Sequence, residues 1–443
     1  AGAAAAAGPA LFVVDADRQP PAAGSGRLNV NLSMYLDPKQ EFAQIFNEGW
    51  RNQRDYLYVK NTHGADWPKM KQMYGALLPY VNHRADLNYL VDMMGHSYVR
   101  GGDMPDVPAS NGGLLGADVV VDSGRYKITR IYDNESWNPD LRAPLDQPGV
   151  DVNVGDYIIA INGVDLRAPD SIYRLLDGTA NKQTVLLVNN RPVADGAHRI
   201  VVTPIGNEQA LRTRAWVEEN RRIVDKLSNG TLAYVYLPNT GQPGYTSFNR
   251  YYFAQQDKQG AIIDERYNGG GSAADYIIDA LQRDFDGYFN NVAGDRVPFT
   301  SPAAGIWGPK VMIINEMAGS GGDLMPWMFR SRKIGTLVGK RTWGGLVHTA
   351  DTPAFVDGGS MIAPRGGFFT REGKWAVENE GVAPDIDVEN WPKDVIGGHD
   401  MQLEKAVEEA MKQLKAHPPT RLMKEPAPPE TGKRTGRGGG GGQ

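Results

Sequence analysis

The sequence predicts a multidomain protein of mixed α+β class, in which a helical segment, an inserted β module and an α/β domain follow one another. Three observations predict this organisation. A chain of 443 residues is too long for one ordinary core. Apolar residues recur at helical spacing up to about residue 98 and in short strand-like runs between residues 115 and 205. Beyond Leu211 helical and strand patterns alternate, which is typical of an α/β domain with a largely parallel sheet.

The predicted boundaries follow these changes of pattern. The N-terminal stretch is rich in alanine and glycine and holds one isolated strand pattern at 11–15. We therefore expect a linker or the end of a missing upstream domain there. The last residues are rich in proline and then in glycine, which is typical of a flexible tail. The predicted domains are 1–37 (linker or upstream end), 38–112 (helical segment), 113–206 (β module), 207–417 (α/β domain) and 418–443 (tail).

Within these parts the hydrophobic period predicts individual elements. Apolar residues three and four positions apart predict helices, and short β-branched runs bounded by turn residues predict strands. The predicted helices are 41–50, 67–80, 84–94, 171–176, 216–227, 251–256, 273–283, 324–330 and 401–415. The predicted strands are 118–122, 126–131, 156–161, 184–188, 232–236, 260–265, 310–314 and 336–338.

Composition limits the function classes. Charged residues make up 22% and hydrophobic residues 41% of the chain, as in a soluble globular protein. The net charge is −5 and only the extreme C-terminus is basic, so nucleic acid is not an expected partner. No apolar run has the length of a membrane span, so we expect no membrane partner. The absence of cysteine excludes disulfides, thiolate catalysis and Cys-ligated zinc, and no metal or other cofactor is expected.

The segment around Ser320 is the main candidate for chemistry. Ser320 lies among small residues between the buried run 310–314 and the helical pattern 324–330. At such a position free N–H groups and the helix dipole favour an oxyanion beside the serine, so Ser320 is a candidate nucleophile and Gly321 a candidate N–H donor. The alternative is a glycine-rich turn whose serine only caps the helix.

A second glycine-rich turn could supply further donors. The strand 260–265 runs into Asn268 and three glycines, of which Gly270 and Gly271 are candidates for the oxyanion hole. A phosphate-binding loop is the rival interpretation, but the GxxxxGK[ST] pattern is absent and the spacing does not fit a dinucleotide fingerprint.

Serine catalysis needs a base and a group that orients it. Among seven histidines, His96 is favoured because it follows a predicted helix and precedes a double glycine, and His348 is the second choice. Glu378 is the candidate acid behind the histidine, because it follows two apolar residues near a predicted strand end. Glu380 and Asp385 remain alternatives for the acid.

The β module resembles a PDZ domain. Its Gly155-Asp156 pair, Ile158, Ile161 and Asn162-Gly163 match the "GD-x-I-x-x-I-N-G" pattern of that family. PDZ domains bind peptide C-termini by adding a strand to a sheet edge, but the loop that holds the carboxylate is not recognisable here.

The order of the segments also resembles the C-terminal half of the tricorn proteases, relatives of the tail-specific serine peptidases. The resemblance rests on Gly95-His96-Ser97-Tyr98, the inserted PDZ-like module, and the motifs at 266–271, 315–320 and 378–385. It covers roughly residues 38–415. It implies a crotonase-like α/β catalytic domain and a serine peptidase acting on short or unfolded peptides.

The resemblance assigns roles to individual residues. Ser320 would be the nucleophile, His96 the general base and Glu378 the acid behind it, with Gly270, Gly271 and Gly321 around the oxyanion. Where the family often has a serine before the histidine this chain has Gly95, so contact between base and acid would be direct, through water or through Ser97. The position after the nucleophile, often Asp in the family, is Gly321. The acidic residue that sets substrate preference in the family has no clean match, and Asp284 and Asp286 are the nearby candidates.

The resemblance also concerns the whole assembly. Tricorn proteases carry β-propellers upstream of the helical segment, and the pattern at 11–15 would be the last piece of one. They form hexamers or larger assemblies, so a homo-oligomer is expected by analogy. The cytoplasm is the preferred location by the same analogy, with the periplasm as the alternative.

Two other functions remain open from the sequence. One is a catalytically inactive, PDZ-containing scaffold that binds peptides. The other is acyl-group chemistry on the crotonase-like architecture, which would leave Ser320 and His96 without a shared purpose.

Overall fold

The computed structural model describes residues 11–13, 26–28, 35–95, 98–102, 104, 107, 110–135, 137–294, 296–419 and 425–427. The chain divides into two compact units, and the polypeptide crosses between them more than once. The first comprises Ala1–Ala215 together with Gly345–Glu380. The second comprises Trp216–Gly344 together with Gly381–Gln443. His96 and Ser97 lie outside the described residues.

The helical part of the first unit follows the predicted pattern. Asp37 starts the first helix by accepting hydrogen bonds from the backbone N–H groups of Lys39 and Gln40, and Pro38 stands at the first helical position. The helices are α1 (Pro38–Tyr56), α2 (Trp67–Gly75) and α3 (Arg84–Gly95), with short 3₁₀ turns at Thr62–Gly64 and Leu78–Tyr80. Their shared core contains Phe46, Leu87 and Val91.

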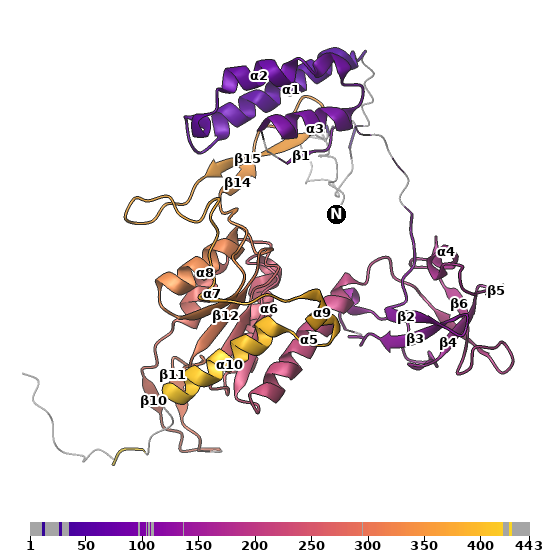
Figure 1. The fold of residues 1–443 in the computed structure, drawn as a ribbon, viewed down its shortest axis with the longest axis vertical. Helices are drawn as coiled ribbons and strands as arrows, with labels where there is room; N and C mark the ends of the chain where they lie inside the picture. The colour runs from indigo at the N-terminus through magenta and orange to yellow at the C-terminus, as the bar shows by residue number, and fades with distance from the viewer. Residues whose placement is uncertain are drawn as a thin grey trace, which may run out of the picture. The chain divides into compact units, whose positions relative to one another are not determined.

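A hairpin from the far end of the sequence completes this core. β1 (Val99–Arg100), β15 (Ser360–Gly366) and β14 (His348–Asp351) form an antiparallel sheet in which β15 is central. Phe355 and Met361 of this segment pack among the buried residues of α1 and α3. Figure 1 shows β15 beside the helices, although α3 ends at Gly95 and β15 begins only at Ser360. The sequence did not predict this hairpin.

The β module forms a separate core in the same unit. Its antiparallel sheet has the order β2-β3-β4-β6-β7, with β5 paired to β4. Asn162 and Gly163 both have positive φ and join β4 to β5 in a tight turn, as the Asn-Gly pair predicts. The elements are β2 (Ala117–Asp122), β3 (Arg125–Ile131), a 3₁₀ turn (Pro139–Leu141), β4 (Tyr157–Ile161), β5 (Val164–Asp165), α4 (Ile172–Leu176), β6 (Thr184–Asn189) and β7 (His198–Val202).

The second unit has α/β architecture. Five parallel strands have the order β16-β13-β12-β9-β8, and helices connect most of them. The strands are β8 (Leu232–Tyr236), β9 (Gly260–Asp264), β12 (Lys310–Ile314), β13 (Gly335–Gly339) and β16 (Ile386–Asp387), and a hairpin is formed by β10 (Gly287–Phe289) and β11 (Phe299–Ser301). The helices are α5 (Gln209–Leu227), which starts in the first unit, α6 (Gln242–Ala254), α7 (Ala274–Leu281), α8 (Gly321–Ser331), α9 (Pro392–Ile396) and α10 (Met401–Ala416).

Two predicted helices are longer than the sequence indicated. α6 begins at Gln242 rather than at residue 251, because Pro243 stands in its first turn, where proline is tolerated. α5 likewise begins at Gln209.

At the N-terminus, residues 11–13 of the predicted strand form only an isolated bridge between Phe12 and Arg27, and residues 14–15 lie outside the described part.

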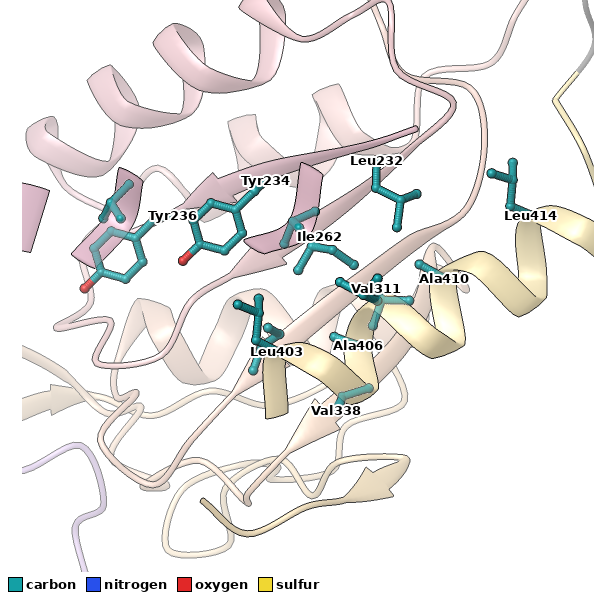
Figure 2. Packing of buried hydrophobic residues seen from close by; sticks show 14 residues of the cluster. Leu232, Tyr234, Tyr236, Ile262, Val311, Val338, Leu403, Ala406, Ala410 and Leu414 are labelled. Atoms are coloured by element: carbon teal, nitrogen blue, oxygen red, sulfur yellow. The ribbon is translucent and has the colours of Figure 1, made fainter. Parts of the chain in front are cut away.

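Both faces of the parallel sheet are buried. Figure 2 shows Leu403, Ala406 and Ala410 of α10 against Ile262 and Val311 of the sheet. The alternate residues of the strands, such as Ile263 and Met312, are also fully buried. Two buried faces explain why these strands appear in the sequence as continuous apolar runs.

The parallel arrangement determines where the loops lie. The carboxyl ends of β8, β9, β12 and β13 all fall on one edge of the sheet. In open α/β sheets ligands bind outside this edge. The loops after these four strands carry the candidate site.

Candidate active site

Ser320 occupies a strained turn between β12 and α8. Its backbone has φ 58° and ψ −117°, a region that residues with a Cβ rarely adopt. The helix begins at the next residue, Gly321, so the serine stands at the positive end of the α8 dipole. A serine on a sharp strand-to-helix turn, with the hydroxyl presented at the top of a sheet, is the arrangement of a nucleophile elbow.

The glycines around Ser320 permit close backbone packing. A Cβ built on Gly270 would lie 2.5 Å from Ser320 Cβ and 2.9 Å from its Oγ. Gly270 also has φ +85°, which disfavours any other residue there. Gly321 packs equally closely against Gly271 and the side chain of Thr240. The structure therefore brings together four of the predicted site residues: Ser320, Gly270, Gly271 and Gly321.

The hydrogen bonds narrow the choice of oxyanion donors. The N–H of Gly270 donates to Asn268 Oδ1 at 2.9 Å and is thus occupied. The N–H of Ser320 donates to Asp323 Oδ2 at 2.8 Å. For Gly271 and Gly321, no acceptor of the N–H lies within the part of the chain that the structure describes. Of the predicted donors, these two keep a free hydrogen.

Loops from two neighbouring strands hold the glycine turn. The N–H of Thr240 donates to the carbonyl of Gly270 at 2.9 Å, and its own carbonyl accepts from Ala273. The carbonyl of Asn268 accepts the N–H of Gly319, the residue before the serine. Thr240 Oγ is buried and has no hydrogen-bond partner among the described residues.

Asp323 is a fully buried carboxylate beneath the turn. Besides the N–H of Ser320, it accepts hydrogen bonds from Thr342 Oγ1 at 2.5 Å and from the N–H of Gly344 at 2.8 Å. Three donors and the N-terminal end of α8 compensate the cost of burying the charge.

A second buried carboxyl lies close to Asp323. Glu265 is fully buried, and one of its oxygens has no partner among the described residues. Burial first, and then the negative charges of Asp323 and Asp264, raise the pKa of Glu265 well above its usual 4.5. This shift favours the protonated form of Glu265, and its other oxygen accepts a hydrogen bond from the side-chain amide of Asn268 at 3.4 Å.

Glu378 lies in the first unit, on a turn in which the residues on either side of it have a strained backbone conformation. Val377 and Asn379 both have positive φ, which for a β-branched residue such as valine is a genuine outlier. Glu378 Oε2 accepts the N–H of Val347 at 2.7 Å, so the half-buried carboxylate has a defined position. Burial, and secondarily the charge of Glu378, raise the pKa of the nearby Tyr58 hydroxyl.

The base and its neighbours are only partly described. Gly95 is the last residue of α3, and its carbonyl accepts the side-chain amide of Gln53. His96 and Ser97, which follow it, lie outside the described residues. His348, the second choice for the base, is exposed at the start of β14.

The other acidic candidates occupy different settings. Asp385 is bound to Arg330 at 2.9 Å and to the N–H of Leu337, which is a structural role in the sheet. Glu380 is exposed. Asp284 and Asp286, the candidates for substrate preference, are exposed just before β10.

Sequence reasoning missed three residues that shape the site: Thr240, Asn268 and Asp323. Asp323 had a visible signal, because an acid three residues after a serine at a helix start is a capping pattern. Asn268 directly precedes the three glycines. Thr240 had no signal, because its contacts depend on the pairing of β8 with β9.

Comparison with known families agrees with this architecture. Residues 231–388 match the model described as "Peptidase family S41", so this part of the chain is a serine-type peptidase domain of that family. Residues 38–95 match the "Tricorn protease C1 domain" and residues 113–207 the "Tricorn protease PDZ domain". The chain thus carries an S41-type peptidase domain together with tricorn-type C1 and PDZ domains.

Individual relatives give the same result. The chain is 31% identical over 397 residues to the tricorn protease of Thermoplasma volcanium, which covers 88% of this chain and 38% of that protein. It is 32% identical over 424 residues to "Tricorn protease homolog 1" of Streptomyces coelicolor, covering 92% of this chain and 39% of the relative. A crystal structure of the tricorn protease matches with a TM-score of 0.79 and 30% identity, over 85% of this chain and 37% of that one. The chain therefore spans less than half the length of these relatives.

The described part of the chain contains no group of three or more His, Cys, Asp or Glu side chains placed to hold a metal ion. It also contains no helix with the length and hydrophobicity that a membrane crossing requires.

Proposed function

We propose that this chain is a serine peptidase that hydrolyses peptide bonds in short or unfolded peptides. One observation carries the proposal: Ser320 is held in a strained conformation at the carboxyl edge of the sheet, and the N–H groups of Gly271 and Gly321 have no acceptor within the described part of the chain. Strain of this kind, of the order of 1–3 kcal/mol, persists only where the surrounding structure imposes it, and it concentrates at functional sites.

In the proposed mechanism Ser320 Oγ attacks the carbonyl carbon of the scissile bond. His96 accepts the serine proton and returns it to the leaving amine, and a water molecule then hydrolyses the acyl-enzyme. The N–H groups of Gly271 and Gly321 donate to the oxyanion of the tetrahedral intermediates, with the α8 dipole adding to the stabilisation. Because the donors are backbone groups, Gly321 needs no side chain for this role.

Glu378 is proposed to orient His96 and stabilise the imidazolium. Its contact with the N–H of Val347 and the strained turn around it support a fixed carboxylate. Gly95 offers no side chain between base and acid, so the two interact directly, through water or through Ser97.

The relatives support the peptidase class, and the assembly is proposed by analogy with them. Their names describe proteases, which favours a peptidase over the inactive peptide-binding scaffold. Asp284 and Asp286 remain the proposed positions for substrate preference. A homo-oligomer, hexameric by analogy, is proposed for the native protein, and its mass in solution tests this directly.

The test is peptide hydrolysis by purified variants. Ser320→Ala is expected to lower kcat by about 10³-fold or more. Ser331→Ala, at the other end of α8, is the matched control and should cleave like the wild type. Persistent cleavage by Ser320→Ala contradicts the proposal. Tight peptide binding by a folded wild-type protein without any turnover would favour the scaffold.

A further inference from the structure

The buried carboxylate of Asp323 is connected to more than the helix that it caps. Its Oδ2 accepts the N–H of Ser320 at 2.8 Å, which fixes the peptide plane that precedes the strained φ of the nucleophile. The same contact withdraws this N–H from the oxyanion, leaving that role to Gly271 and Gly321. An acid that served only to cap the N-terminus of α8 would accept hydrogen bonds from the first turn of that helix alone.

The other oxygen of Asp323 reaches the loop after β13. It accepts Thr342 Oγ1 at 2.5 Å and the N–H of Gly344 at 2.8 Å. Gly344 is the last residue of the second unit before the polypeptide crosses into the first. Asp323 therefore holds the point from which segment 345–380 departs.

Thr342 extends the same network to the point of return. Its N–H donates to the carbonyl of Val382 at 3.1 Å, and its Oγ1 accepts the N–H of Val382 at 2.8 Å. Val382 is the second residue after the chain re-enters the second unit at Gly381. Gly344 and Val382, which flank segment 345–380, are thus both linked to the carboxylate that holds Ser320. Gly344 is bound to Asp323 directly, and Val382 is bound through the hydroxyl of Thr342.

We propose that Asp323 is a positioning residue of the peptidase site, whose carboxylate fixes the backbone of Ser320 and both ends of the segment that carries Glu378. The proposal rests on the peptidase function proposed above. In this role the buried carboxylate of Asp323 determines the backbone geometry of Ser320. It also fixes the positions at which segment 345–380, which contains Glu378, leaves and re-enters the second unit. An error of about 1 Å in such a geometry costs roughly 100-fold in rate.

The experiment measures the reactivity of Ser320 separately from the stability of the fold. The rate at which a fluorophosphonate modifies Ser320 is determined per folded molecule, alongside kcat, KM and the melting temperature. Asp323→Asn replaces one acceptor oxygen by an amide group and breaks at least one of the contacts. We expect the labelling rate and kcat to fall roughly 10- to 100-fold, with KM changed less than about threefold.

Two further variants separate positioning from stability. Thr342→Val removes the hydroxyl that joins Asp323 to Val382 and should also slow labelling, whereas Thr342→Ser keeps the hydroxyl and should restore it. Asp66→Asn makes the same chemical change at the cap of α2 and should affect only the melting temperature. If Asp323→Asn does not fold, the Thr342 pair gives the answer.

The outcomes are distinct. Labelling rates within about twofold of wild type in folded Asp323→Asn or Thr342→Val, with only a lower melting temperature, overturn the positioning role and leave the peptidase proposal intact. A wild-type protein that neither labels nor cleaves peptides defeats the proposed function itself.

Discussion

The Cα of Gly270 lies directly against the side chain of Ser320: a methyl group added at Gly270 would stand 2.5 Å from Ser320 Cβ. The loop after β9 and the turn after β12 therefore meet without room for any side chain between them. This contact joins the glycine turn that carries Gly271 to the candidate nucleophile.

Gly270→Ala is accordingly expected to disable the site. The new methyl group must displace Ser320 or the loop, and the φ of +85° adds strain of about 1 kcal/mol or more. We expect peptide hydrolysis to fall at least 100-fold. The neighbouring Gly269 provides the control, because a Cβ there meets nothing within 4 Å. Equal activities of Gly269→Ala and Gly270→Ala would show that this packing does not matter.

Glu378→Gln tests the acid proposed behind the histidine. The amide oxygen can still accept the N–H of Val347, so the turn should survive while the charge is lost. We expect kcat to fall by at least tenfold, with about 10⁴-fold as the upper limit for such an acid. Glu380→Gln, two residues away and exposed, is the control. A Glu378→Gln variant with wild-type kcat would remove Glu378 from the mechanism.

The buried Glu265 should make stability depend on pH. Burial, and then the charges of Asp323 and Asp264, raise its pKa in the folded state above the 4.5 of the unfolded chain. Between these two pKa values the folded state holds more protons, so the free energy of unfolding decreases as pH rises. Glu265→Gln should flatten this decrease in urea titrations above pH 4.5.

Glu316→Gln, the same change at an exposed position after β12, serves as the control and should keep the wild-type slope. A Glu265→Gln variant with an unchanged pH slope would mean that Glu265 is not held protonated.

Lys310 makes the opposite contribution. Burial lowers the pKa of its ammonium from 10.5 to about 8, and its nitrogen contacts only the carbonyl of Gly308, at 3.2 Å, within the described residues. Between pH 8 and 10.5 the unfolded chain holds more protons, so stability rises with pH. Lys310→Met should therefore stabilise the protein at pH 7, by about 2 kcal/mol.

This gain should shrink as pH rises from 8 towards 10.5 and level off above 10.5, where the lysine becomes neutral in both states. Lys374→Met, at an exposed position, provides the comparison. Denaturation curves that show no gain at pH 7, or a gain independent of pH, would contradict the account.

Much of the second unit was predictable from the sequence. Its strands are buried on both faces, so 232–236, 260–265 and 310–314 stand out as apolar runs with clear ends. Residues that follow such ends must meet at one edge of a parallel sheet. Ser320 and Gly270 both follow such strand ends, and the structure brings the two residues together.

Other features depend on contacts that local patterns do not encode. β15 contains Pro364, which argues against a strand that is paired on both sides, yet β15 lies between β1 and β14. A register shift next to its pairing with Thr349 accommodates the proline. The contacts of Asp323 with Thr342 and Gly344 likewise arise only when β12 and β13 are paired.

The choice of donors shows the same limit. Gly270 and Gly271 were equivalent in the sequence, but the Asn268 side chain accepts the N–H of Gly270, whereas that of Gly271 has no acceptor among the described residues. One side-chain hydrogen bond decides between them, and its geometry comes from the folded loop.

Covalent labelling tests the central claim most directly. The wild-type chain is treated with a fluorophosphonate, and the modified residue is located by mass spectrometry of its fragments. The proposed mechanism predicts a single adduct on Ser320, which is lost in Ser320→Ala and also in His96→Ala. An adduct on any other residue, or labelling of Ser320→Ala at the wild-type rate, would contradict the assignment of Ser320 as the nucleophile.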